Sequence, residues 1–125
     1  MPVMEERYEP APTAPRHARR FVARALRRWQ CQPEVRDQAD LLTSEIVSDA
    51  LRQSPSQIAV QVEVDDDRVR VEVSDDPGVM RDPNKGEFER RTARRMLRNL
   101  AHRWGSDLDL GRTTTWFELR RGGRH

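Results

Sequence analysis

The chain has 125 residues, a length that suits a single domain with one hydrophobic core. Hydrophobic and charged residues each make up 35% of the sequence, and no apolar run is long enough to predict a membrane-spanning helix or a signal peptide. The net charge of +2 conceals an acidic middle, because residues 31–89 carry fifteen acids and six basic residues whereas arginines dominate both ends. Such a charge can attract nucleic acid, nucleotide or an acidic protein, and does not choose among them.

The N-terminal part of the chain predicts an extended arm and then a basic helix. Prolines and a lack of apolar material indicate a flexible arm over residues 1–15, where an edge strand would have only Val3, Met4 and Tyr8 to bury. In residues 16–30 apolar side chains form one stripe and arginines cover the remainder, as in an amphipathic helix. The basic face is either a docking surface for an acidic partner or nucleic acid, or simply a solvated surface.

A second helix is predicted from Pro33 to Ser54, because proline suits the first helical position and Pro55 ends the helix. Its apolar face, which should lie on a sheet, consists of Ala39, Leu42, Ile46 and Ala50. Just before this helix, Cys31 is the lone cysteine, so that no internal disulfide can form. A chain without disulfides is typical of the reducing cytoplasm.

A β-hairpin is predicted next. Residues 58–64 and 69–73 alternate apolar and polar side chains, as strands with one buried face do. Residues 65–67 are three aspartates that make the turn between the strands, and SDDPG closes the second strand.

The last third of the chain predicts a loop, a helix and a second hairpin. Residues 79–91 are polar and show no period, which indicates a mobile loop. Residues 92–103 have the spacing of an amphipathic helix with an arginine-rich outer face. Two further strands, over residues 106–110 and 113–120, should be joined by a turn at Gly111.

These elements can bury their apolar faces as an α+β two-layer sandwich, in which three helices cover a mixed or antiparallel sheet of four or more strands. One domain would then occupy residues 16–120. Residues 121–125 would form a disordered basic tail.

Two acids stand out on the flank of the second predicted helix. Glu45 and Asp49 are four residues apart and therefore share a helix face, where two carboxylates repel unless a positive group lies between them. A metal ion is one such group, since carboxylate oxygens bind hard cations. The alternative is a solvated helix face that carries both acids by chance.

The order of these pieces resembles the GHKL (histidine-kinase-like, Bergerat-type) ATPase fold, and within it the small actinobacterial-type anti-sigma factors and serine-protein kinases. The resemblance covers residues 14–119. It rests on the acidic helix, VSDDPG at a strand end, a polar stretch before a helix, and GRTTTWFEL near the C-terminus. It implies ATP and Mg²⁺ as cofactors.

The resemblance also implies roles for single residues. The family's acidic helix carries Glu-x-x-x-Asn, in which the glutamate acts on the attacking group and the asparagine binds magnesium. These positions are Glu45 and Asp49 here, so an aspartate replaces the asparagine and adds a negative charge beside the triphosphate. Asp75 matches the aspartate that accepts a hydrogen bond from adenine, although the glycines that follow it in the family are missing or shifted to Gly78.

Phosphate binding in the family uses a glycine-rich helix start and a threonine near the C-terminus. Arg91, Thr92 and Ala93 occupy the place of the Gly-x-Gly whose backbone N–H groups hold the phosphates. Arg91 and Arg94 could replace those contacts by charge. Thr114 matches the threonine that faces the nucleotide pocket.

Two classes of function stay open. The first is a cytoplasmic anti-sigma factor that binds a sigma factor, can pair as a homodimer as family members often do, and phosphorylates an anti-anti-sigma protein with Glu45 as the catalytic residue. The second is a nucleotide-free member of the same fold that acts by protein contact alone. Direct DNA binding is a third interpretation, but no helix-turn-helix pattern supports it.

Overall fold

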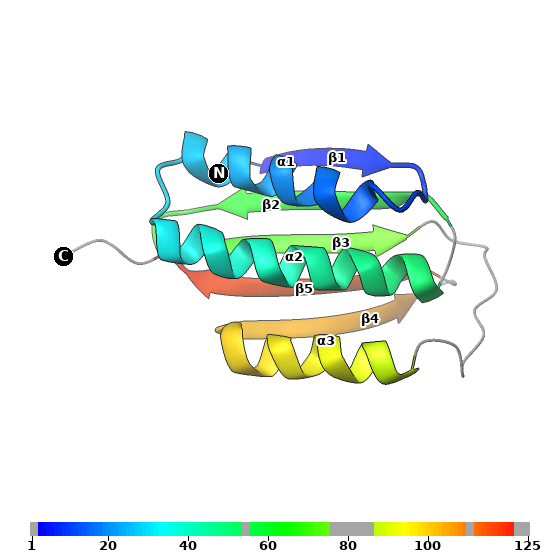
Figure 1. Ribbon diagram of the computed structural model, residues 1–125. Helices are drawn as coiled ribbons and strands as arrows, with labels where there is room; N and C mark the ends of the chain where they lie inside the picture. The colour runs from blue at the N-terminus through cyan, green and yellow to red at the C-terminus, as the bar shows by residue number, and fades with distance from the viewer. Residues whose placement is uncertain (1–2, 54–55, 76–86, 110–111, 122–125) are drawn as a thin grey trace.

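The computed structural model describes residues 3–53, 56–75, 87–109 and 112–121, without the side chains of residues 53, 87–91, 108 and 109 (Figure 1). Its elements follow the chain as β1 (Val3–Tyr8), α1 (Ala14–Arg28), α2 (Pro33–Gln53), β2 (Ile58–Val64), β3 (Arg68–Asp75), α3 (Glu87–Leu100), β4 (Arg103–Asp109) and β5 (Arg112–Arg120). Among the described helices, none combines the length and the apolar character that crossing a membrane requires.

The five strands form one sheet in the order β1-β2-β3-β5-β4. All four strand pairs are antiparallel, and this corrects the mixed sheet allowed by the sequence. The two central strands, β3 and β5, are distant in sequence and pair from Arg68 with Arg120 to Ser74 with Thr114. The last residues of β3 therefore lie beside the first residues of β5.

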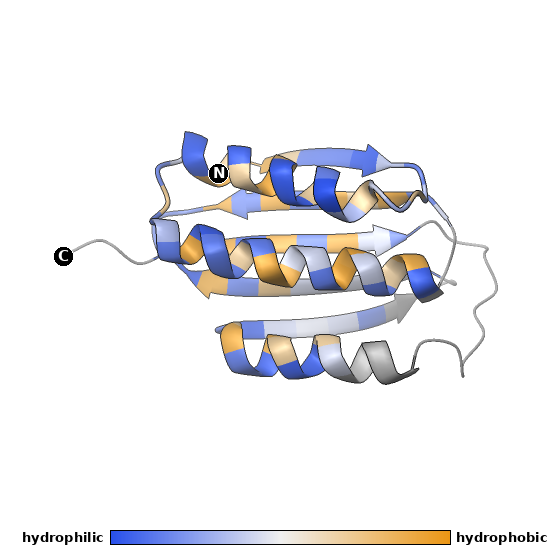
Figure 2. Cartoon of the chain, in the orientation of Figure 1, coloured by the Kyte–Doolittle hydropathy of each residue, from blue (hydrophilic) through white to orange (hydrophobic). Residues whose placement is uncertain are grey.

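All three helices cover the same face of the sheet, which gives the predicted α+β two-layer sandwich (Figure 1). Apolar and polar residues alternate along helices and strands alike, so each element has an inner face (Figure 2). The core between the layers is built mainly from valine and leucine, with Phe21 of α1 and Phe117 of β5 as its largest fully buried side chains. The predicted inner face of α2 is confirmed, since Ala39, Leu42 and Ile46 are buried.

The N-terminal arm is a correction to the sequence-based prediction. Residues 3–8 form the edge strand β1, which pairs with β2 from Val3 opposite Glu63 to Tyr8 opposite Ile58. The inner face of β1 contains Glu6, whose carboxylate accepts hydrogen bonds from the Tyr8 hydroxyl at 2.9 Å and from Arg24 of α1 at 3.2 Å. A glutamate at an inward position hides the apolar alternation that would have predicted this strand.

Three boundaries near the C-terminus also differ from the prediction. Helix α3 begins at Glu87 rather than Thr92, so part of the predicted loop is helical. It ends at Leu100, and β4 begins at Arg103, where the sequence predicted the end of the helix. Arg121, assigned to the tail, is ordered: its backbone N–H donates to the Asp67 carbonyl at 2.8 Å, and its guanidinium donates to the carbonyls of Asp65 and Trp29. The turn at Gly111 and the rest of the predicted tail lie outside the described residues.

Candidate functional site

A small cavity lies between α2 and the central strands, where β3 ends and β5 begins. Its volume is about 20 Å³. Two carboxylates, Asp49 of α2 and Asp75 of β3, line it together with Ile46, Ala50, Val73, Thr113 and Thr115. The structure thus brings together the predicted metal ligand and the predicted adenine-binding residue.

Asp75 is the last residue of β3, and its neighbour on β5 fixes it. The Thr113 backbone N–H donates to Asp75 Oδ1 at 2.8 Å. Asp75 is only 3% exposed, so its carboxyl group is buried in the fold rather than solvated in a surface turn. A buried carboxylate of this kind can accept a hydrogen bond from a buried donor, which a solvated acid does poorly.

Glu45 does not line this cavity. Its carboxylate lies 3.6 Å from an Arg52 guanidinium nitrogen, and both side chains are partly exposed. The two acids of the helix therefore have different surroundings. Asp49 lines the cavity with Ile46 and Ala50, whereas Glu45 lies on the flank of the helix beside Arg52.

Thr114, which was predicted to face the nucleotide pocket, lies on the other face of the sheet from the Asp49–Asp75 cavity. Side chains alternate along a strand, so Thr113 and Thr115 turn toward the cavity while Thr114 turns away. Phe117 and Leu119 are buried on the helix side of β5, so the odd-numbered residues of this strand face the helices. This parity was readable in the sequence and would have selected Thr113 and Thr115.

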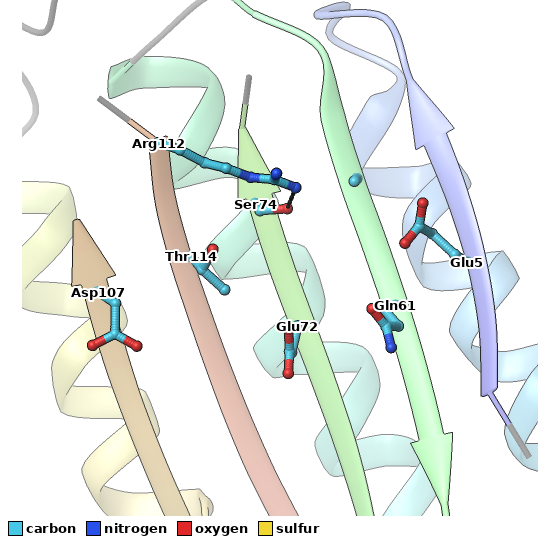
Figure 3. A pocket seen from close by; sticks show the side chains of 8 residues that line it. Glu5, Gln61, Glu72, Ser74, Asp107, Arg112 and Thr114 are labelled. Atoms are coloured by element: carbon cyan, nitrogen blue, oxygen red, sulfur yellow. Dashed lines mark hydrogen bonds between the residues drawn. The ribbon is translucent and has the colours of Figure 1, made fainter. Parts of the chain in front are cut away.

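The open face of the sheet, where Thr114 lies, carries a wider polar hollow of about 290 Å³ (Figure 3). Arg112 reaches across it and donates to Ser74 Oγ at 3.1 Å (Figure 3). Its remaining lining is Glu5, Ala59, Gln61, Glu72 and Asp107. Although larger, this hollow is shallow and lies on the face away from Asp49 and Asp75, so it is not the counterpart of the predicted nucleotide site.

The predicted phosphate contacts at the start of α3 lie partly outside the described residues. Gly78 and the Arg91 side chain lie outside the described part of the structure. Because α3 begins at Glu87, residues Arg91 to Ala93 are in its second turn, where backbone N–H groups are bonded within the helix. Ala93 is buried and Thr92 is half-buried. Their backbone therefore cannot form the phosphate cradle that the resemblance placed there.

The described residues suit an adenine nucleotide in chemistry but not in volume. Asp75 offers an acceptor for an amino group, and Asp49 offers the oxygen that Mg²⁺ prefers. However, a cavity of 20 Å³ holds about one water molecule, whereas small-molecule sites enclose roughly 300 Å³ or more. Among the described residues, no group of three or more His, Cys, Asp or Glu side chains could hold a metal ion. As they stand, these residues do not fit Mg-ATP.

Comparisons with known proteins agree with the fold. The histidine kinase-like ATPase domain family matches residues 8–112. A crystal structure of the RsbU and RsbW domains of Rv1364c from Mycobacterium tuberculosis has a TM-score of 0.76 and 18% sequence identity, and the alignment covers 99% of this chain and 34% of that chain. At this identity the likeness shows the fold alone, and the chain spans about a third of that structure's length. A comparison with curated proteins finds no match. With most of its length matched, the chain belongs to the histidine kinase-like ATPase family.

Proposed function

We propose that the protein is an anti-sigma-factor-like regulator of the cytoplasm that binds a sigma factor or an anti-anti-sigma protein by direct contact, without needing a nucleotide. The observation that carries this proposal is the cavity of about 20 Å³ between Asp49 and Asp75. Among the described residues its volume is far below that of a small-molecule site, which supports a function without a nucleotide. A regulator that binds no nucleotide can still present the outer surface of the fold to a protein.

Three similarities support the choice of partner classes. The histidine kinase-like ATPase family supplies the domain type. The solved structure with the same fold contains a domain named RsbW, and the sequence resembles anti-sigma factors over residues 14–119. Together they support a sigma factor or an anti-anti-sigma protein as the partner to test first.

The second candidate is an Mg-ATP-dependent serine/threonine kinase. It is favoured by one observation, namely that Asp49 and Asp75 line the same cavity as the family's magnesium and adenine positions would. In that case Glu45 would act on the hydroxyl group of the substrate protein, and Glu45→Ala would abolish phosphotransfer. Loss of the exposed Glu45–Arg52 pair should leave the fold intact, because such pairs contribute less than about 1 kcal/mol.

The experiment exposes the tagged protein to each sigma factor and each anti-anti-sigma protein of its source organism, first without nucleotide and then with radiolabelled Mg-ATP. The proposal predicts retention of at least one of these proteins without nucleotide and no labelling of any. Retention of none would contradict it. Labelling that disappears in Glu45→Ala would establish the kinase instead.

A further inference from the structure

A groove of about 330 Å³ runs between α1 and α2, at the end of the helical layer remote from the Asp49–Asp75 cavity. Arg36, in the first turns of α2, precedes Asp49 by thirteen residues, which is about 20 Å along a helix. The lining comprises Ala23 and Arg27 of α1 and Pro33, Arg36, Asp37 and Asp40 of α2. This groove plays no part in the function proposed above.

Two arginines of the groove form no ion pair within the described part of the chain. None of the ion pairs there joins Arg27 or Arg36 to a carboxylate. Arg36 Nε is buried and has no hydrogen-bond partner among the described residues. A buried donor without a partner is unfavourable, so an acceptor brought by another molecule would form a favourable hydrogen bond there.

The groove also contains acids, and they leave these arginines unpaired. Asp37 is exposed, and Asp40 lies 3.9 Å from Arg19, which is one helical turn before Ala23 on α1. Arginines and aspartates thus line one groove, and among the described residues no ion pair joins an arginine of the lining to an aspartate of the lining. The lining is complementary to a segment that carries both an acid and a base.

The face of α1 that lines the groove carries further arginines. Arg16, Arg20, Ala23 and Arg27 follow at spacings of four, three and four residues, which places them on one helix face. The first turn of α1 contains no acid, although acids are favoured there by the helix dipole. Like charges at these spacings destabilise a helix, so a partner that neutralised them would gain binding energy. The small Ala23 interrupts the arginines and gives a partner backbone room to approach.

We propose that this groove binds an acidic helical segment of a partner protein, with a carboxylate between Arg27 and Arg36 and a basic side chain against Asp37. Ala23 lies under the bound segment. A protein fits better than a nucleic acid, because Asp37 and Asp40 would repel a continuous phosphate backbone. The site does not depend on which regulatory protein is the partner, and it does not involve the nucleotide cavity.

The test uses fluorescence anisotropy with a labelled helical peptide of about 20 residues that carries a pair of glutamates one turn apart and an arginine on the next turn. A peptide with every charge reversed and a DNA duplex serve as competing probes. Arg27→Glu should weaken binding of the acidic peptide by at least about tenfold. The matched control Arg28→Glu makes the same charge change on the same exposed helix end, outside the groove, and should weaken binding less than about twofold.

A second variant changes shape without charge. Ala23→Leu fills the groove and should weaken the acidic peptide at least about fivefold; circular dichroism melting checks that each variant folds, and Arg36→Gln replaces Ala23→Leu if the latter does not. Equal effects of Arg27→Glu and Arg28→Glu would overturn the proposal, since they would indicate unspecific charge attraction. So would tighter binding of the DNA or of the charge-reversed peptide, or no binding of the acidic peptide up to about 1 mM.

Discussion

At the scale of single residues, Glu118 shows how the open face of the sheet is held together. It is 3% exposed on β5, and its carboxylate accepts hydrogen bonds from Arg70 at 2.9 Å and from Arg68 at 3.4 Å. The Arg70 guanidinium also lies over the Trp116 ring, 4.1 Å from its centroid. Burial lowers the pKa of Arg70, but its hydrogen bonds to Glu72 and Glu118 outweigh this and raise the pKa.

Glu118→Ala should lower the free energy of unfolding by about 2 kcal/mol, because two charge-assisted hydrogen bonds are lost and two arginines are left without their buried partner. Urea unfolding followed by tryptophan fluorescence measures this loss. The matched control is Glu72→Ala, whose side chain is 32% exposed and pairs with Arg70 at 2.9 Å; it should lose less than about 1 kcal/mol. An equal loss in both variants would show that burial of Glu118 contributes nothing.

For the candidate site, the sequence predicted which residues could take part but not which of them would lie together. Asp49 and Asp75 were predicted from a resemblance, and the structure places them on one cavity. Glu45 could not be placed, because a helix flank is shared with Arg52, seven residues on, and the sequence does not show which charges pair. Thr114 was predicted one position away from Thr113 and Thr115, although strand parity could have corrected it.

At the scale of elements, the β2–β3 hairpin was the part of the fold most completely encoded locally. Val and Ile alternation predicted both strands, and the aspartate turn joins them. Asp65 Oδ1 accepts hydrogen bonds from the backbone N–H groups of Asp67 and Arg68, both at 2.8 Å. These bonds are formed within four residues, so the turn can form locally, and Arg121 adds hydrogen bonds to the carbonyls of Asp65 and Asp67.

Asp65 should make stability depend on pH. The backbone N–H of Asp67 lowers the pKa of the Asp65 carboxyl group, with help from Arg68. A lowered folded-state pKa stabilises the protein above the unfolded value of about 3.9, and the contribution is lost as pH falls through the folded-state value. The difference in unfolding free energy between wild type and Asp65→Asn should therefore be constant near neutral pH and shrink below about pH 4.

The matched control for this prediction is Asp67→Asn, an exposed aspartate of the same turn. Urea unfolding midpoints across acidic pH should show no such shrinking difference for that variant. A difference for Asp65→Asn that stays constant down to pH values where the carboxyl group is protonated would contradict the assigned role.

Strand β1 and the start of helix α3 could not be predicted from the local sequence pattern. Strand β1 has Glu6 at an inward position, and its partner for hydrogen bonding, Arg24, comes from α1 eighteen residues later. Helix α3 begins five residues before the predicted start, within a stretch without apolar period. In both cases tertiary contacts decide a structure that local pattern leaves undetermined.

At the scale of the whole molecule, the chain keeps the architecture of an ATPase family, and the described residues leave about 20 Å³ between Asp49 and Asp75. Three helices cover one face of the sheet, and α2 lies over the junction of β3 and β5 where Asp49 and Asp75 meet (Figure 1). Fold class and the order of elements from α1 onward were predictable, because both follow from hydrophobic period. The size of the cavity was not, since it depends on how closely α2 packs against the strands.

The Asp49–Asp75 cavity lies where the family resemblance predicts a nucleotide site, and its volume of about 20 Å³ is far below that of a small-molecule site. Calorimetric titration of wild type and Asp49→Asn with ATP, with and without magnesium, tests the importance of this volume most directly. Because removing the charge of Asp49 does not enlarge the cavity, both proteins should bind ATP with dissociation constants above about 1 mM. Micromolar binding of ATP by the wild type or by Asp49→Asn would contradict the nucleotide-independent function proposed for this protein.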